Sequence, residues 1–381
     1  MNREIDEKIL TSKHNILLEF PTGFGKSKCA LDIVTHNNYK KVLIVIPRLV
    51  LKENWKAEIK KWGGSQASYV TYISLYKHAG IEYDCIIFDE CHHLSDRCLD
   101  IIDTLKYKQA ILLSATVSKN KWYDFQTVFR PIERHKISLQ QAVADEVLPS
   151  PQIILLPLKL DTQNQTCTFT KGKGKEKIEC NFVDRWKYFK NPKYTVTVKC
   201  TPAQYHLEMS NMIEWYKRAS FSKPVMKNLW LNKAGQRLRW LSQIKEEQVV
   251  QLINSLKNQR FLIFCSSIEQ TELFGNAVNS NQKEQTALQQ FNECKINYIS
   301  ACNMIDEGLN ITACKYGIFA GLNSSDRMII QKGGRILRHH EPVLIIPYFE
   351  GTRDEEIKNK MIVNYNPRLI KTINNLNELK L

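Results

Sequence analysis

Short apolar runs recur along the first third of the chain, at residues 16–18, 42–46, 85–88 and 110–113. The first of these runs is followed by a helix-compatible stretch over residues 28–34. Apolar runs bounded by polar and glycine-containing segments predict buried strands. Strands that alternate with helices predict a parallel sheet. This part of the chain is therefore expected to form an α/β unit.

The middle of the chain changes its pattern twice. Residues 162–200 are polar, alternating and turn-rich, which indicates a short antiparallel element with an exposed turn at 171–175. From residue 201 the apolar positions recur at three- and four-residue steps, which predicts a helix. A second helical pattern over 246–256 leads into another apolar run at 261–265.

The segment after the first apolar run has the composition of a phosphate-binding loop. Its sequence is F-P-T-G-F-G-K-S, and it stands between a predicted strand and a predicted helix. In that context backbone N–H groups close around a polyphosphate, Lys26 reaches the outer phosphates and Ser27 can ligate Mg²⁺. Phe20 occupies the place of the first glycine in the full pattern, so a chance glycine turn is the alternative. The predicted nucleotide contacts are Pro21, Thr22, Gly23, Phe24, Gly25, Lys26 and Ser27.

Two carboxylates, Asp89 and Glu90, come directly after the apolar run at 85–88. Ligands of α/β sheets bind at the carboxyl ends of the strands, where both this pair and the glycine loop fall. Asp89 is predicted to hold Mg²⁺, and Glu90 to orient or deprotonate an attacking water. The alternative is an ordinary acidic pair at the N-terminus of a helix.

With these motifs the chain resembles the superfamily 2 helicases and translocases. The acidic segment reads D-E-C-H at 89–92 and has the family's D-E-x-H form. Further short matches follow in the family's order. They are 47–49 with 53–55, 70–72, Ser114-Ala115-Thr116, 306–310 and the Q-x-x-G-R-x-x-R segment at 331–338.

The resemblance implies an α/β fold of two RecA-like parallel-sheet lobes with an inserted basic α+β element. The expected domains are lobe 1 at residues 1–140, a linker with the inserted element at 141–250, and lobe 2 at 251–381. Such an enzyme uses ATP and Mg²⁺ at the cleft between its lobes.

The resemblance also assigns residues of the second lobe to the site. Gly308 is expected to contact the nucleotide, and Gln331, Arg335 and Arg338 to act with Lys26 and Glu90 in catalysis. An arginine placed against the γ-phosphate stabilises the charge of the transition state, so hydrolysis would require the lobes to close. A basic helix face is the alternative for the two arginines.

Other residues connect the nucleotide to nucleic acid in this family. His92, Ser114 and Thr116 are expected to couple the two sites, and Arg48 and Thr71 to contact nucleic acid. Two departures stand out: residues 1–20 contain no glutamine to read adenine, and Asn310 replaces a common Asp. The short interval before residue 306 predicts a compact second lobe with a short strand at 274–279.

Composition agrees with a folded enzyme of two or three domains. Hydrophobic residues make up 43% of the 381 residues, which is ample for packed cores. The sequence contains no run of about 20 apolar residues, so no membrane span is predicted. The charged N-terminus lacks the apolar core of a signal peptide. We therefore expect no membrane partner.

The eleven cysteines are scattered singly, without a C-x-x-C pair. They are interpreted as reduced core residues, which favours a cytoplasmic location, or the host cytoplasm for a viral protein. Cys91, His92, His93 and Cys98 could be imagined as a zinc site, but their spacing fits no common structural pattern.

The formal charge of +15 favours a polyanionic partner. Residues 171–200 hold nine basic residues and three acidic ones, with Trp186, Tyr188, Phe189 and Tyr194 interleaved among them. Aromatic rings beside cations can stack bases while the cations follow phosphates. A β-hairpin with a solvated, lysine-rich turn and a small aromatic core is the alternative. The predicted phosphate contacts are Lys171, Lys173, Lys175 and Lys177.

The function expected from these features is a nucleic-acid-dependent ATPase that acts as a DNA helicase or translocase. DNA is favoured because Trp55 and the segment 351–355 resemble DNA-directed members, which include type III restriction subunits and phage branch-migration helicases. An RNA helicase and an inactive nucleic-acid-binding scaffold are the alternatives. A nuclease or a replication or recombination protein as partner stays open.

Overall fold

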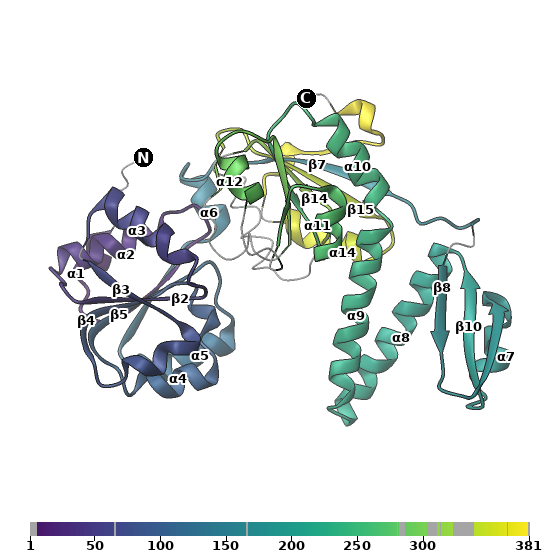
Figure 1. Cartoon of the computed structure of the whole chain (residues 1–381), viewed down its shortest axis with the longest axis horizontal. Coiled ribbons are helices and arrows are strands. Elements are labelled where there is room, and N and C mark those ends of the chain that lie inside the picture. The colour runs from purple at the N-terminus through teal and green to yellow at the C-terminus, as the bar shows by residue number, and fades with distance from the viewer. Residues whose placement is uncertain are drawn as a thin grey trace.

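The computed structural model of the chain describes residues 6–64, 66–164, 167–279, 281, 286–302, 311–312, 314–322, 339–363 and 365–379. Every structural statement below concerns these residues. Figure 1 shows two large sheets covered by helices, and a small sheet beside a pair of long helices.

The first lobe is built on a parallel sheet of six strands in the order β3-β2-β4-β5-β1-β6. The strands are β1 Asn15–Glu19, β2 Val42–Ile46, β3 Ala67–Thr71, β4 Glu82–Phe88, β5 Lys106–Ser114 and β6 Ile132–Lys136. Its helices are α1 Glu7–Thr11, α2 Lys26–His36, α3 Leu51–Trp62, α4 Asp96–Ile102 and α5 Lys119–Val128, with 3₁₀ turns η1 Tyr72–His78 and η2 Cys91–His93.

The inner strands β1 and β2 are almost wholly buried because helices cover both faces of the sheet, whereas the edge strand β6 is polar. In β2, Ile44 packs with α2 and α3, whereas Leu43 and Val45 pack with α4 and α5 on the opposite face. The continuous apolar run at 42–46 therefore forms a central strand, as its sequence predicted.

The second lobe has a parallel sheet of seven strands in the order β12-β13-β11-β14-β15-β7-β16. The strands are β7 Gln152–Leu158, β11 Phe261–Phe264, β12 Ala277–Val278, β13 Tyr298–Ala301, β14 Tyr316–Phe319, β15 Val343–Phe349 and β16 Ile370–Thr372. Its helical segments are α10 Glu246–Ser255, α11 Ile268–Phe274, α12 Thr286–Asn292, α14 Arg353–Ile362, η5 Pro367–Leu369 and η6 Leu376–Glu378.

Two details of this sheet differ from the sequence expectation. β7 lies inside the range 141–250, yet it pairs with β15 and β16 of the second lobe. Its alternate residues are buried on both faces of the sheet, Ile153 on one and Ile154 on the other, so this apolar run forms a core strand and not a linker. The strand predicted at 274–279 is only the two residues of β12, because α11 continues to Phe274.

A small sheet follows β7, with strands β8 Cys167–Lys171, β9 Glu176–Asn181 and β10 Tyr194–Cys200. The expected antiparallel pairing holds for β8 and β10, but β10 lies between β8 and β9 and runs parallel to β9. β8 and β9 therefore do not form the β-hairpin of the alternative interpretation. The crossing segment, η3 Phe182–Asp184 and α7 Arg185–Phe189, is long enough to return the chain to the middle of the sheet.

The lysine–glycine turn between β8 and β9 passes directly over the start of β10. A Cβ atom at Gly174 would lie 1.9 Å from the Lys193 carbonyl oxygen. Thr195 Oγ1 donates to the Gly174 carbonyl at 2.8 Å. Only glycine fits this close approach.

Two long helices, α8 Pro202–Ser222 and α9 Met226–Gln243, complete the insert and pack against each other. Thr201 and Gln204 form a reciprocal capping box at the start of α8, with Pro202 in the first turn. At the other end of the pair, the Lys245 ammonium lies 2.7 Å from the Asp354 carboxylate, and both side chains are buried. The helix pair is thus fixed to α14 of the second lobe (Figure 1).

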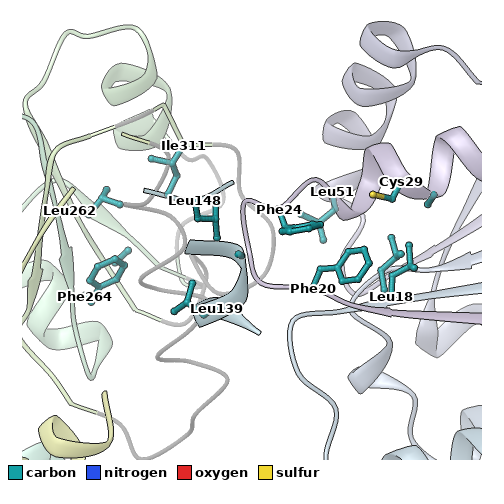
Figure 2. Packing of buried hydrophobic residues seen from close by; sticks show 14 of the residues in the cluster. Leu18, Phe20, Phe24, Cys29, Leu51, Leu139, Leu148, Leu262, Phe264 and Ile311 are labelled. Atoms are coloured by element: carbon teal, nitrogen blue, oxygen red, sulfur yellow. The ribbon is translucent and has the colours of Figure 1, made fainter. Parts of the chain in front are cut away.

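The segment around α6, Leu139–Ala144, connects the two lobes. Leu139 and Leu148 lie between Phe24 of the first lobe and Phe264 of the second, and all four belong to one cluster of buried side chains (Figure 2). Across the described ranges, no helix is both long and apolar enough to cross a membrane.

Candidate nucleotide site and nucleic-acid interface

The glycine loop connects β1 to α2, as the sequence predicted. Gly23 and Gly25 have φ angles of 89° and 99°, a region that residues with a Cβ rarely adopt. Gly25 is the N-cap of α2, so the first N–H groups of that helix open into the loop. A turn of this kind at the N-terminus of an eleven-residue helix is suited to bind an anion.

The side chains of the loop fit a polyphosphate ligand. The Lys26 ammonium donates to the Phe20 carbonyl at 3.0 Å and so lies over the loop. The Thr22 hydroxyl is buried and has no hydrogen-bond partner among the described residues. A buried hydroxyl of this kind calls for an acceptor or donor from a ligand. Lys26 and Thr22 therefore match a site for nucleotide phosphates.

Asp89 and Glu90 follow β4, two strands from β1 in the sheet order. Burial, together with the neighbouring Glu90 carboxylate, raises the pKa of Asp89. The Trp55 indole opposes this rise, because its Nε1 donates to Asp89 Oδ2 at 2.9 Å. The Tyr72 hydroxyl donates to the Asp89 carbonyl at 2.6 Å. Asp89 is thus held through both its side chain and its backbone.

Glu90 is joined to the segment after β5 by His92. His92 Nδ1 lies 3.3 Å from Glu90 Oε2 and 3.2 Å from Ser114 Oγ. The Ser114 hydroxyl donates to the Thr116 carbonyl at 2.9 Å, so it accepts from His92 and Nδ1 carries the proton. The three residues predicted to couple the sites therefore lie in one chain of polar contacts.

A further buried carboxylate, Glu19, stands directly before the glycine loop. Arg134 Nη2 lies 2.5 Å from its Oε2 and Lys136 Nζ lies 3.5 Å from its Oε1. The Val117 amide donates to Glu19 Oε1 at 3.3 Å. Glu19 thereby ties the start of the loop to the segment after Thr116.

The sequence predicted no contact at the nucleotide site for Trp55, Tyr72 or Glu19. A tryptophan or tyrosine that is buried almost always finds a hydrogen-bond acceptor, and Trp55 and Tyr72 are both buried. Trp55 and Tyr72 belong to the short motifs at 53–55 and 70–72, which the sequence shows. The acceptor, Asp89, became identifiable only when β2, β3 and β4 were placed side by side.

Arg48 and Thr71 lie at the carboxyl ends of β2 and β3, on the same edge of the sheet as Asp89. Both residues are partly exposed. The sheet order places this edge next to the nucleotide site. The described part of the chain contains no group of three or more side chains suited to hold a metal ion on their own. Burial also raises the pKa of the Cys91 thiol, which disfavours a thiolate ligand there.

The residues predicted from the second lobe, Gly308, Gln331, Arg335 and Arg338, lie outside the described residues. The lysines of the insert lie far along the chain from the nucleotide site. Lys173, Lys175 and Lys177 are exposed, whereas Lys171 Nζ lies over the Phe189 ring, 4.4 Å from its centroid. Lys171 is the least free of the four to reach a phosphate.

Comparison with known proteins agrees with this arrangement. Residues 1–82 match the family "Type III restriction enzyme, res subunit", and residues 244–340 match "Helicase conserved C-terminal domain". The chain is 24% identical to the "DNA 3'-5' translocase XPB2" of Sulfurisphaera tokodaii, over 92% of this chain and 81% of that protein. These matches support a helicase or translocase of superfamily 2, as the resemblance implied.

The fold of this chain is also seen in a solved structure. The Hef helicase domain of Pyrococcus furiosus superimposes with a TM-score of 0.50 at 15% sequence identity, covering 93% of this chain and 95% of that one. The prediction of two RecA-like lobes is confirmed, and so is the prediction of a helicase-type enzyme.

Proposed function

We propose that this superfamily 2 enzyme hydrolyses ATP at the glycine loop and uses the reaction to move along or unwind DNA. The observation that carries the proposal is the chain of contacts from Glu90 through His92 to Ser114, beside a loop shaped for phosphates. In this proposal lobe 1 spans residues 1–140. β7 belongs to lobe 2 and not to the linker, because it pairs with β15.

The chemistry follows from the positions of the side chains. The amides of Gly23 to Ser27 and the Lys26 ammonium would bind the phosphates of ATP. Ser27 and Asp89 would hold Mg²⁺, which supplies positive charge against the β- and γ-phosphates when bound. Glu90 would accept a proton from the attacking water and hold that proton on its carboxylate.

His92 would transmit the protonation state of Glu90 to Ser114. As the Glu90 carboxylate takes a proton, it becomes a weaker acceptor for His92 Nδ1–H, which then favours Ser114. Ser114 donates to the Thr116 carbonyl, and the next residue, Val117, donates to Glu19, so Ser114 is linked to the segment that Glu19 ties to the loop. This gives a route by which hydrolysis changes the nucleic-acid surface of lobe 1.

Lobe 2 would complete the site. Gly308, Gln331, Arg335 and Arg338 are proposed to meet the nucleotide when the lobes close, with the arginines facing the γ-phosphate. An arginine in that position acts on the charge of the transition state. Opening and closing would then shift a strand bound across Arg48 and Thr71.

DNA is the proposed partner because the similar protein from Sulfurisphaera tokodaii is described as a DNA translocase. The lysines at 173, 175 and 177 are proposed as added phosphate contacts, since they are exposed. Lys171 contributes less because its ammonium lies over an aromatic ring.

The test is the steady-state ATPase rate of the purified protein with single-stranded DNA, duplex DNA, RNA or no nucleic acid. Stimulation by DNA well above that by RNA supports the proposal. Stimulation by RNA alone assigns the chain to the RNA helicases. Absence of hydrolysis under every condition, with nucleic acid still bound, identifies the chain as a scaffold.

A further inference from the structure

The insert carries most of the net charge of the chain. Residues 159–245 contain eighteen Lys and Arg against six Asp and Glu, a surplus of 12 out of the formal +15. Residues 246–381 hold fifteen of each sign and are neutral overall. An anionic partner is therefore attracted chiefly to the small sheet and to the helix pair α8–α9.

The far end of this helix pair is apolar and exposed. Phe221 at the end of α8 is 85% exposed, and Val225, directly before α9, is 77% exposed. Trp215, almost two turns earlier on α8, is 60% exposed. We call residues 214–232, which include the turn between the helices, the hairpin tip. Large side chains that make so little contact within the chain indicate a binding surface.

Cations surround the exposed rings of the hairpin tip. Its basic residues are Lys217, Arg218, Lys223 and Lys227, all of them exposed. Its single acidic residue is Glu214, whose carboxylate lies 3.1 Å from Arg218 Nε. Two copies of such a tip would repel each other, so charge opposes self-association through this surface. Exposed rings among cations suit a nucleic acid, whose bases stack while its phosphates pair with the cations.

The helix pair is anchored so that its tip moves with lobe 2. The buried Lys245–Asp354 ion pair fixes the end of α9 to α14. Arg237 Nη1 donates to Ser210 Oγ at 3.0 Å, and the Tyr205 and Trp240 rings lie 4.6 Å apart, so α8 and α9 act as one unit. Closure of lobe 2 on lobe 1 would therefore displace the tip relative to a strand held on lobe 1.

We propose that the hairpin tip binds nucleic acid at the junction between duplex and single strand, with Phe221 stacked on the exposed face of the last base pair. Lys217, Lys223 and Lys227 contact the flanking phosphates. This inference rests on the proposed function. The hairpin tip is then a second contact with nucleic acid, beside the surface of lobe 1, and it holds the strands apart while the lobes move.

The test compares Phe221→Ala with Phe221→Trp, which keeps an aromatic ring. A matched control is Tyr123→Ala, because Tyr123 is a 70% exposed aromatic residue on α5 of the first lobe. Fluorescence anisotropy measures the affinity for a forked DNA with single-stranded arms and for a single strand without a junction. Loss of one stacked base weakens binding by roughly 5- to 150-fold.

The inference predicts that Phe221→Ala loses affinity for the fork within this range and unwinds poorly, while Phe221→Trp and Tyr123→Ala resemble wild type. Thermal unfolding of all variants should match, because both side chains are exposed. Fork affinity unchanged in Phe221→Ala overturns the inference. Concentration-dependent self-association that Phe221→Ala abolishes, with fork affinity intact, also overturns it and assigns the tip to a second copy.

The two proposals fail in different measurements. A wild-type protein whose ATPase does not respond to any nucleic acid contradicts the proposed function. A wild-type ATPase that responds to DNA, combined with a Phe221→Ala variant of normal fork affinity, contradicts only the role of the tip.

Discussion

Replacing Trp55 by phenylalanine isolates one hydrogen bond in the nucleotide site. The indole Nε1 donates to Asp89 Oδ2 at 2.9 Å, and the indole is almost fully buried. A hydrogen bond to a charged group is worth about 1.5–3 kcal/mol. Phenylalanine keeps an aromatic ring in the core but offers no donor, so the Asp89 carboxylate loses a partner that orients it and favours its ionised form.

The expected result is that the ATPase requires higher Mg²⁺ concentrations. If the whole energy of the hydrogen bond is used to orient Asp89, the apparent Mg²⁺ affinity falls by roughly 10- to 150-fold, since about 1.4 kcal/mol corresponds to a factor of ten. The assay is the ATPase rate at fixed ATP and fixed DNA over a series of Mg²⁺ concentrations. Thermal unfolding without nucleotide measures the separate loss of core packing.

Trp62 provides the control within the same helix. Its Nε1 donates to Glu58 Oε2 at 2.9 Å, away from Asp89. Trp62→Phe makes the same chemical change and should leave the Mg²⁺ dependence as in wild type. A Trp55→Phe variant with the Mg²⁺ dependence of wild type would refute the assignment of Asp89 as the metal carboxylate held by Trp55.

Three further predictions concern other parts of the chain. Arg335→Ala and Arg338→Ala should each lower turnover by about 10³–10⁵-fold while ATP binding persists; weaker ATP binding with normal turnover, measured by nucleotide titration, would contradict the role of the arginines. Changing the four lysines at 171–177 to alanine should flatten the slope of log K against log [salt] by roughly 0.7–0.9 for each lost phosphate contact, whereas an unchanged slope returns the segment to a solvated turn. Lys245→Met should lower the free energy of unfolding by about 3–5 kcal/mol, because Asp354 stays buried and unpaired. Adding Asp354→Leu should recover most of that loss in denaturant melts, and no recovery would argue against the pair as the cause.

Much of the first lobe could be predicted because its signals are local. The run at 42–46 forms β2 with the predicted bounds, and the glycine loop stands between β1 and α2. The D-E-x-H segment with Ser114 could be placed because both follow apolar strands. In each case the strand and the chemical group adjoin in sequence.

The missed features depend on contacts between distant segments. β7 enters the sheet of lobe 2 beside β15, a strand almost 200 residues later. β10 pairs between β8 and β9, an order that the crossing segment sets and that strand patterns alone do not specify. The acceptors of Trp55 and Tyr72 likewise depend on the order of neighbouring strands.

The central claim is that Glu90 drives hydrolysis of ATP in a reaction coupled to DNA. Glu90→Gln keeps the size of the side chain and removes the base, so the most direct measurement is the DNA-stimulated ATPase rate of this variant beside its ATP binding. The account predicts a rate lower by about 10²–10⁴-fold with ATP still bound. Hydrolysis by Glu90→Gln at the wild-type rate would contradict it.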